Sequence, residues 1–230
     1  MALNVVGEID DRVAVRHVLM SVSDKTGLET FVPGLVQACP DVRILSTGGT
    51  YTAVGQILGP VLARKHLVPV SDYTGQPEMQ GGLVKTLDFK IYLGLLSETY
   101  NSAHQQDLAR TQAVAIDMVV VNLYPFKQAV ARLGVTPEEA RTHIDIGGPC
   151  MVRASAKNYL RVASVTDPAD YASLLGELGA QRGTLGLATR LCLMKKAFAH
   201  TAQYDAAIAA FFANVAEEQS RRAYTVHGAP

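Results

Sequence analysis

Short apolar runs alternate with helical patterns along most of the chain. Runs rich in β-branched residues predict strands, and the segments between them repeat their apolar positions at the helical period. We expect strands at 15–22, 41–46, 67–70, 115–124 and 161–166, and helices at 27–39, 50–58, 137–144, 149–160 and 167–182. The run at 115–124 is apolar on both faces, as is typical of a strand inside a parallel sheet. This alternation predicts a doubly wound, mostly parallel α/β sheet.

Two parts of the chain depart from the alternation. The run at 83–96 fits neither the strand nor the helix period, so the pattern leaves its structure open. From residue 184 onward the pattern is wholly helical, and no linker rich in proline, glycine or serine precedes it. We therefore expect one domain over 1–230, with an α/β core at about 16–183 and a C-terminal helical extension at about 184–220.

The composition narrows the class of protein. With 48% hydrophobic and 18% charged residues, the chain can bury a large core. Because 21 basic residues balance 21 acidic ones, the net charge offers no bulk attraction for nucleic acid or an acidic membrane. Cys39, Cys150 and Cys192 have no paired spacing, which favours a reducing cytoplasm over a disulfide framework or a zinc site. The sequence has neither a signal-peptide pattern nor an apolar run of the roughly 18 residues that span a bilayer.

Polar turns after the first two predicted strands are candidate phosphate sites. They contain Ser23, Lys25 and Thr26 after the first strand, and Ser46, Gly48, Gly49 and Thr50 after the second. In such sheets ligands bind at the carboxyl ends of the strands, and N–H groups at a helix start attract phosphate. Serine and threonine are also common helix caps, so each turn alone is weak evidence. The chain has neither a P-loop nor a dinucleotide fingerprint, and the two turns together suggest one pocket for a phosphate monoester.

Further polar side chains follow the later strands. Asn122 and Tyr124 stand at the end of the run at 115–124, and Asp145 precedes a Gly-Gly turn that opens a helix. Arg153 and Lys157 are four residues apart on that helix and therefore share a face. The pattern leaves open whether Lys157 points inward or into solvent.

Three other side chains have a simpler interpretation. Cys150 has no adjacent base in the sequence, so we interpret it as a small core or turn residue. His200 and Tyr204 share one face of the helical extension, where packing against other helices is the expected role.

Seven segments together resemble one family in their order and spacing. They are SVSDKTGL, STGGT, TGQPEMQGGLVKTL, VVVNLYPF, IDIGGPCMVRASAKN, DPADY and KAFAHTAQYDAAI. From about residue 16 to 212 the chain resembles the inosine monophosphate (IMP) cyclohydrolase domain, the N-terminal half of a bifunctional purine-synthesis enzyme that also carries a formyltransferase. The resemblance implies a methylglyoxal-synthase-like fold. It also implies closure of the purine ring of 5-formamidoimidazole-4-carboxamide ribonucleotide to IMP, with loss of water and without a metal or organic cofactor.

The resemblance implies a site built from all of these turns. Substrate-binding residues would be Ser23, Lys25, Thr26, Ser46, Gly48, Gly49, Thr50, Thr86, Asn122, Ile146 and Gly147. Catalytic residues would be Lys85, Tyr124, Asp145 and Lys157. Lys85 would polarise the formyl carbonyl, while Asp145 and Lys157 would manage proton transfer. Tyr124 and Asn122 would orient the carboxamide side of the substrate.

The chain departs from the family pattern after residue 82. Leu83, Asp88 and Phe89 stand where the family has arginine, histidine and proline, and Tyr92 replaces a further histidine. Losing the arginine would remove a charge and up to five hydrogen-bond donors. These changes leave open a purine-nucleotide-binding regulatory module with weak or no catalysis. A methylglyoxal-synthase-type lyase is a further alternative, which the segments at 122–126 and 144–158 disfavour.

The expected partner is a small ribonucleotide monophosphate, and we expect neither a nucleic-acid nor a membrane partner. No segment resembles the formyltransferase half, so the sequence is expected to be a stand-alone cyclohydrolase or a domain of a longer protein. A separate formyltransferase could then supply the substrate. The family's bifunctional members are dimers, so a homodimer also stays open.

Overall fold

The centre of the protein is a parallel five-stranded sheet. The computed structural model describes residues 4–77 and 85–228. The strands lie in the order β4-β3-β2-β5-β6, and each neighbouring pair is parallel. They are β2 (His17–Val22), β3 (Arg43–Ser46), β4 (Leu67–Pro69), β5 (Met118–Asn122) and β6 (Ala163–Val165). The predicted mostly parallel α/β fold is therefore confirmed, and each of these strands falls inside its predicted run.

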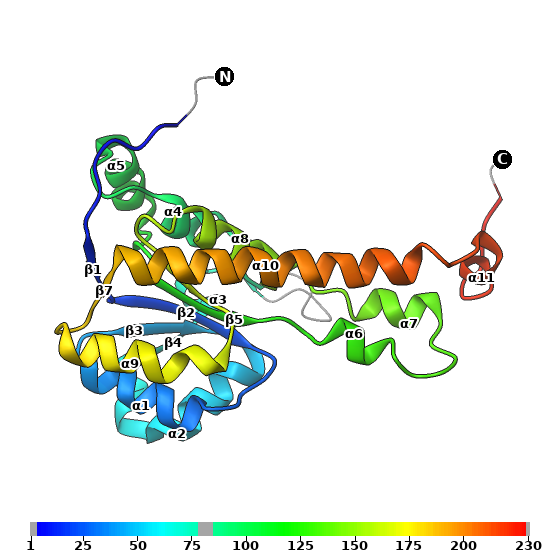
Figure 1. Ribbon diagram of the computed structural model, residues 1–230, viewed down its shortest axis with the longest axis horizontal. Coiled ribbons are helices and arrows are strands. Elements are labelled where there is room, and N and C mark those ends of the chain that lie inside the picture. The colour runs from blue at the N-terminus through cyan, green and yellow to red at the C-terminus, as the bar shows by residue number, and fades with distance from the viewer. Residues whose placement is uncertain (1–3, 78–84, 229–230) are drawn as a thin grey trace.

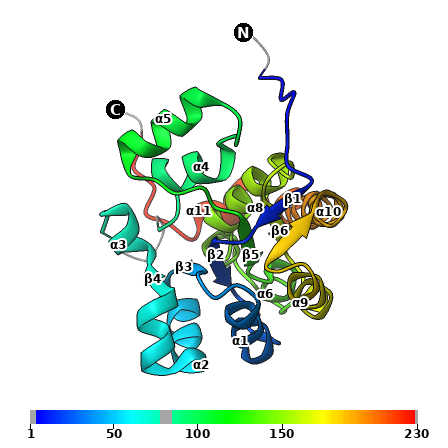
Figure 2. The ribbon, with the colours of Figure 1, turned by 90° about the vertical axis from the view of Figure 1, so that its left-hand side faces the viewer.

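Helices cover both faces of the sheet (Figures 1 and 2). One face carries α1 (Leu28–Ala38), α2 (Gly48–His66) and α9 (Tyr171–Ala180). The other carries α4 (Phe89–Leu96), α8 (Gly147–Lys157) and the long α10 (Leu187–Phe212). Successive side chains of a strand point to opposite faces, so Met20 packs in the core under α1 whereas Leu19 packs in the core under α4 and α8.

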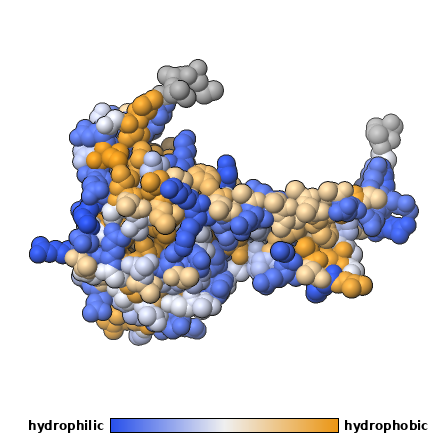
Figure 3. All heavy atoms as spheres, in the orientation of Figure 1, coloured by the Kyte–Doolittle hydropathy of each residue, from blue (hydrophilic) through white to orange (hydrophobic). Residues whose placement is uncertain are grey.

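Helix α10 extends beyond the sheet as an arm (Figure 1). It packs against α8 and β6 near the sheet and against α6 (Phe126–Ala129) farther out. Next to α6 lies α7 (Pro137–Thr142), which contacts α11 (Glu217–Arg221) at the end of the arm. Figure 3 shows the side of this arm facing the viewer as a band of mildly apolar residues, in keeping with the alanine-rich sequence of α10. None of the helices in the described ranges is both long and apolar enough to cross a bilayer.

The segment from residue 184 begins with a strand that the sequence pattern did not predict. Strand β7 (Thr184–Gly186) pairs antiparallel with β1 (Arg12–Ala14), and Arg12 lies opposite Gly186. The expectation of helix throughout this segment is therefore wrong at its start. The physical reason is that the strand partner comes from the other end of the chain, where no local period reveals it.

The ambiguous run at 83–96 becomes helical at Phe89. Asp88 caps α4, since its carboxylate accepts a hydrogen bond from the Lys90 backbone N–H at 2.8 Å. Residues 83 and 84, including the departure at Leu83, lie outside the described residues. Helices not predicted from the pattern include α3 (Val70–Thr74), α5 (Ser102–Thr111) and α6. The segment predicted as one helix at 167–182 starts with a 3-10 turn at Pro168–Asp170 before α9.

Helix α2 is longer than predicted and contains a kink. It continues from the predicted end at residue 58 to His66, and the break lies at Gly59. Gly59 has a φ of 68°, in the left-handed region that favours glycine, and Pro60 follows it. The first segment of α2 starts at Gly48, within the turn that was predicted to bind phosphate.

Candidate active site

The turn after β2 is held rigidly by the neighbouring strand. The Asn122 side-chain oxygen accepts hydrogen bonds from the backbone N–H groups of Ser23 and Asp24 at 2.7 and 2.9 Å. The Asn122 amide nitrogen donates to the Asp24 carbonyl at 2.8 Å. Asn122, which was predicted to orient the carboxamide of the substrate, therefore directs its amide at the turn. Its observed role is to fix the β2–α1 turn at the carboxyl end of β5.

The same turn is braced from within. Asp24 accepts hydrogen bonds from the Thr26 backbone N–H at 2.9 Å and from the Thr26 hydroxyl at 2.7 Å. The hydroxyl and the N–H of Thr26 both lower the pKa of Asp24, because they stabilise its ionised form. The Thr26 hydroxyl donates to Asp24 rather than outward. Lys25, by contrast, is exposed, and its amine lies 3.5 Å from the Ser23 carbonyl.

In the second turn, the hydroxyls of Ser46 and Thr50 face the protein interior. Ser46 is fully buried and donates to the Met20 carbonyl at 2.8 Å. The Thr50 hydroxyl lies 3.0 Å from the Val22 N–H and 3.1 Å from the Val22 carbonyl. Ser46 thus ties the end of β3 to β2, and Thr50 ties the first turn of α2 to β2. The sequence suggested that both hydroxyls bind phosphate, but the structure commits them to this internal role because they point toward the sheet.

Two lysines from distant segments lie at the first turn of α2. A Cβ atom built on Gly48 would be 3.3 Å from the amine of Lys85, and one on Gly49 would be 3.9 Å from the amine of Lys25. Gly48 itself has a φ of 54°, which favours glycine. The N-terminus of a helix carries partial positive charge and N–H groups without helical partners. Two ammonium groups beside it make this turn a suitable place for an anion.

Thr86 connects this turn to the start of α8. Its side chain is buried, and its hydroxyl would be 2.9 Å from a Cβ atom built on Gly147. Gly147 is the first residue of α8, so residues 85 and 86 lie between the first turns of two helices. The structure thus brings together the predicted segments at 23–26, 46–50, 85–86 and 145–148.

Asp145 lies over the first turn of α8. Its carboxylate accepts a hydrogen bond from the Gly148 N–H at 2.9 Å. Burial raises the pKa of Asp145, and the N–H groups of Gly148 and Tyr124 oppose this increase because they stabilise the carboxylate. Gly148 leaves room for the carboxyl group: a Cβ atom at this position would overlap the Asp145 Oδ2 atom and approach Leu123 Cδ2 to 2.7 Å. A carboxyl group with a raised pKa is suited to exchanging protons with a ligand.

Two predicted residues near Asp145 are exposed. Ile146, which precedes α8, is 56% exposed, and Tyr124, which follows β5, is 60% exposed. Both are therefore available to contact a flat ring, because their side chains are not committed to the core.

Lys157 does not join this group. It is exposed at the last turn of α8, ten residues after Gly147, which corresponds to about 15 Å along the helix. It lines a separate cavity of about 450 Å³ together with Arg153, Met194 and Phe198. Asp145 lies at the start of α8 and Lys157 at its end, so the shared role in proton transfer stays a prediction from the resemblance.

Sequence reasoning missed two features around α10. The Tyr204 hydroxyl accepts a hydrogen bond from the Asp145 backbone N–H at 2.7 Å, although Tyr204 was expected only to pack. Its ring does pack edge-on against Phe126, with centroids 6.3 Å apart. The sequence shows Tyr204 only as a tyrosine on the apolar side of a helix. That position does not identify the group to which its hydroxyl bonds.

The second feature is a cavity of about 640 Å³ behind the β2–α1 turn, between the ends of β5 and β6 and α10. His200 lines it, and burial lowers the pKa of this histidine. Its Nε2 atom is buried without a hydrogen-bond partner within the described part of the chain. Lys196, also in the wall, is paired with Asp170 at 2.5 Å. No group of metal-ligating side chains occurs in this cavity or elsewhere among the residues described.

The parallel sheet, with helix starts gathered at its carboxyl edge, defines the chain as a doubly wound α/β domain. Residues 27–150 match the family model of the MGS-like domain, and residues 155–229 match that of the AICARFT/IMPCHase bienzyme. The chain therefore belongs to the MGS-like family, in the form found in the AICARFT/IMPCHase bienzymes.

Named relatives support this assignment. The chain is 48% identical over 194 residues to the bifunctional purine biosynthesis protein PurH of Enterococcus faecalis, covering 84% of this chain and 36% of that protein. It is 46% identical over 204 residues to the protein of the same name from Sorangium cellulosum. This match covers 89% of this chain and 37% of that protein. The chain thus spans a little over a third of these relatives. A crystal structure of ForH aligns with a TM-score of 0.72 and 30% identity, covering 86% of this chain and 98% of that one.

Proposed function

We propose that the protein is an IMP cyclohydrolase in purine biosynthesis. It would close the ring of 5-formamidoimidazole-4-carboxamide ribonucleotide: the carboxamide nitrogen attacks the formyl carbon, and water leaves as the new carbon–nitrogen double bond forms. The observation that carries the proposal is the convergence of Lys25 and Lys85 on the start of α2, with Thr86 leading to Asp145 at the start of α8. The names of the relatives point to the same pathway.

The start of α2 supports binding of the 5′-phosphate. Because Ser46 and Thr50 are committed to β2, the phosphate would be held by backbone N–H groups at Gly48 and Gly49 and by the lysine amines. A phosphate fixed at this turn would place the base toward Thr86 and Asp145. Holding the carboxamide and formyl groups in reach of each other is itself a large part of such a reaction, because both belong to one molecule.

The start of α8 supports the chemistry at the base. We assign Asp145 to proton transfer during attack and loss of water, which its raised pKa favours. We assign Lys85 to the negative charge that develops on the formyl oxygen. Its amine lies at Gly48, beside the proposed phosphate position, so Lys85 could contribute to phosphate binding as well. The exposed side chains of Tyr124 and Ile146 would flank the base.

The direct test is turnover of the formamido nucleotide by the purified chain. We expect an absorbance change as the purine ring forms, with IMP identified by chromatography. Folded protein that binds the nucleotide by calorimetry but gives no IMP would contradict the proposal and favour a regulatory nucleotide-binding module. Release of methylglyoxal from dihydroxyacetone phosphate would instead indicate a lyase.

A further inference from the structure

Tyr204 on α10 contacts the loop that carries Asp145. Its side chain is largely buried, with 9% of its surface accessible. The hydroxyl accepts a hydrogen bond from the Asp145 backbone N–H at 2.7 Å and donates a longer one to the His143 carbonyl at 3.4 Å. One phenol therefore bonds to the backbone on both sides of Ile144.

The Asp145 main chain and the Asp145 carboxylate are held by different groups, the carboxylate by the Gly148 N–H. It consists of the residues between the end of α7 at Thr142 and the start of α8 at Gly147. The backbone N–H groups of His143 and Ile144 bond back to α7. The hydrogen bond from the Asp145 N–H, however, goes to Tyr204. The Asp145 main chain is therefore held by a side chain from the helical extension, which acts on the carboxylate together with its own bond to the Gly148 N–H.

The ring of Tyr204 is itself held in place. Phe126 of α6 lies edge-on to it, and Phe126 is buried between Tyr204 and Phe211 of the same helix. The phenol thus has a fixed direction, which is what a group needs in order to position another. This gives α10 a role in the site beyond covering the sheet.

We infer that Tyr204 is a positioning residue for Asp145, fixing the carboxylate over the first turn of α8. The expected effects on kinetics rest on the proposed function. The hydrogen bond between Tyr204 and the Asp145 backbone can be tested without any activity. Because the hydrogen bonds of the Tyr204 hydroxyl go to the Asp145 loop and not to the turns that would bind phosphate, its loss should affect the chemical step more than substrate binding.

The test is Tyr204→Phe, which removes the hydroxyl and keeps the ring against Phe126. We expect kcat to fall about tenfold, the factor that one neutral hydrogen bond can supply, with KM unchanged within about twofold. Tyr73→Phe is the matched control, since the Tyr73 hydroxyl accepts a hydrogen bond from the Val114 backbone N–H at 3.0 Å. It should lower the melting temperature by a similar amount without lowering kcat.

A double variant separates positioning from general stability. If Tyr204 acts through Asp145, Tyr204→Phe should cause no further loss of kcat in an Asp145→Asn background. An equal loss in both backgrounds would overturn the inference, as would a kcat equal to that of the Tyr73→Phe control.

Hydrogen exchange keeps the inference testable even without turnover. In Tyr204→Phe the Asp145 amide should exchange at least about tenfold faster than in the wild type, because it loses its acceptor. An unchanged exchange rate would contradict the inference. A wild-type protein that does not turn over would contradict only the proposed function, and the exchange rate would still decide the link between Tyr204 and Asp145.

Discussion

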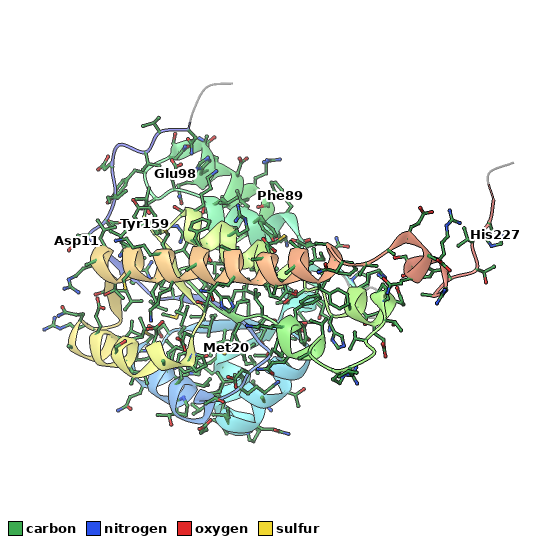
Figure 4. The ribbon with its side chains drawn as sticks, turned by 45° about the vertical axis from the view of Figure 1, so that its right-hand side comes forward. Asp11, Met20, Phe89, Glu98, Tyr159 and His227 are labelled. Carbon is green, nitrogen blue, oxygen red and sulfur yellow. The ribbon has the colours of Figure 1, made fainter. Side chains whose placement is uncertain are left out.

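Replacing Arg190 should destabilise the protein strongly. The Arg190 side chain is almost completely buried, with 1% of its surface accessible. Its Nε donates to the Tyr159 carbonyl at 3.0 Å, and its Nη2 donates to Asp10 and Leu160 carbonyls at 2.8 and 3.1 Å. Its Nη1 donates to the carbonyls of Asp11 and Leu185. The guanidinium thereby joins the segment before β1 to β7 and to the loop before β6. Figure 4 shows Asp11 and Tyr159 near the same end of α10.

The expected magnitude follows from the acceptors that Arg190→Met would leave behind. Each buried carbonyl without a partner costs about 1–3 kcal/mol. The full sum does not apply, because the carbonyls are neighbours that can relax together and because the variant no longer buries a charge. We therefore expect a loss of about 3–5 kcal/mol, in the range of disrupted buried networks. For a chain of this size the melting temperature should fall by roughly 6–20 °C.

The assay is urea unfolding followed by circular dichroism, with the midpoint and slope fitted separately. Arg190→Lys should be intermediate, since lysine keeps the charge but lacks the planar fork. Arg110→Met is the control, because Arg110 is exposed and its ion pair, within the described residues, is with Asp107 three residues earlier on the same helix. A change below about 1 kcal/mol in Arg190→Met would refute the reasoning, because it would mean that the five acceptors need no guanidinium.

Three predictions concern the proposed active site. Gly148→Ala should lower kcat at least about 100-fold, because the new methyl group displaces the Asp145 carboxylate. The control is Gly176→Ala, which should retain activity because the added Cβ meets open space. Lys85→Ala should lower kcat/KM at least about 100-fold, with Lys195→Ala on the exposed side of α10 as the control; parallel losses in both would argue against a site at Lys85. In the pH profile of kcat, activity should fall at low pH as Asp145 is protonated. Because burial raises the pKa of Asp145, this fall should lie above the usual aspartate range near pH 4. If the same fall persists in Asp145→Asn, another group causes it.

The sequence by itself determined the strands of the sheet and the turns at its carboxyl edge. Apolar runs such as 115–124 report a local period, and the order of strands and helices follows from it. The turns at 23–26 and 46–50 were found in the same way, because each follows a strand directly. The contacts of Lys25, Lys85 and Thr86 with the helix-start glycines show that these separate segments lie close together at that edge.

Only the tertiary structure decided in which direction the side chains of those residues point. The hydroxyls of Ser46 and Thr50 turn toward β2, and Lys157 falls at the far end of α8 from Asp145. Side-chain direction depends on the neighbour across the contact, which is not encoded in a single segment. The same holds for Tyr204: its partner is a backbone N–H in another segment, which the periodicity of its own helix cannot reveal.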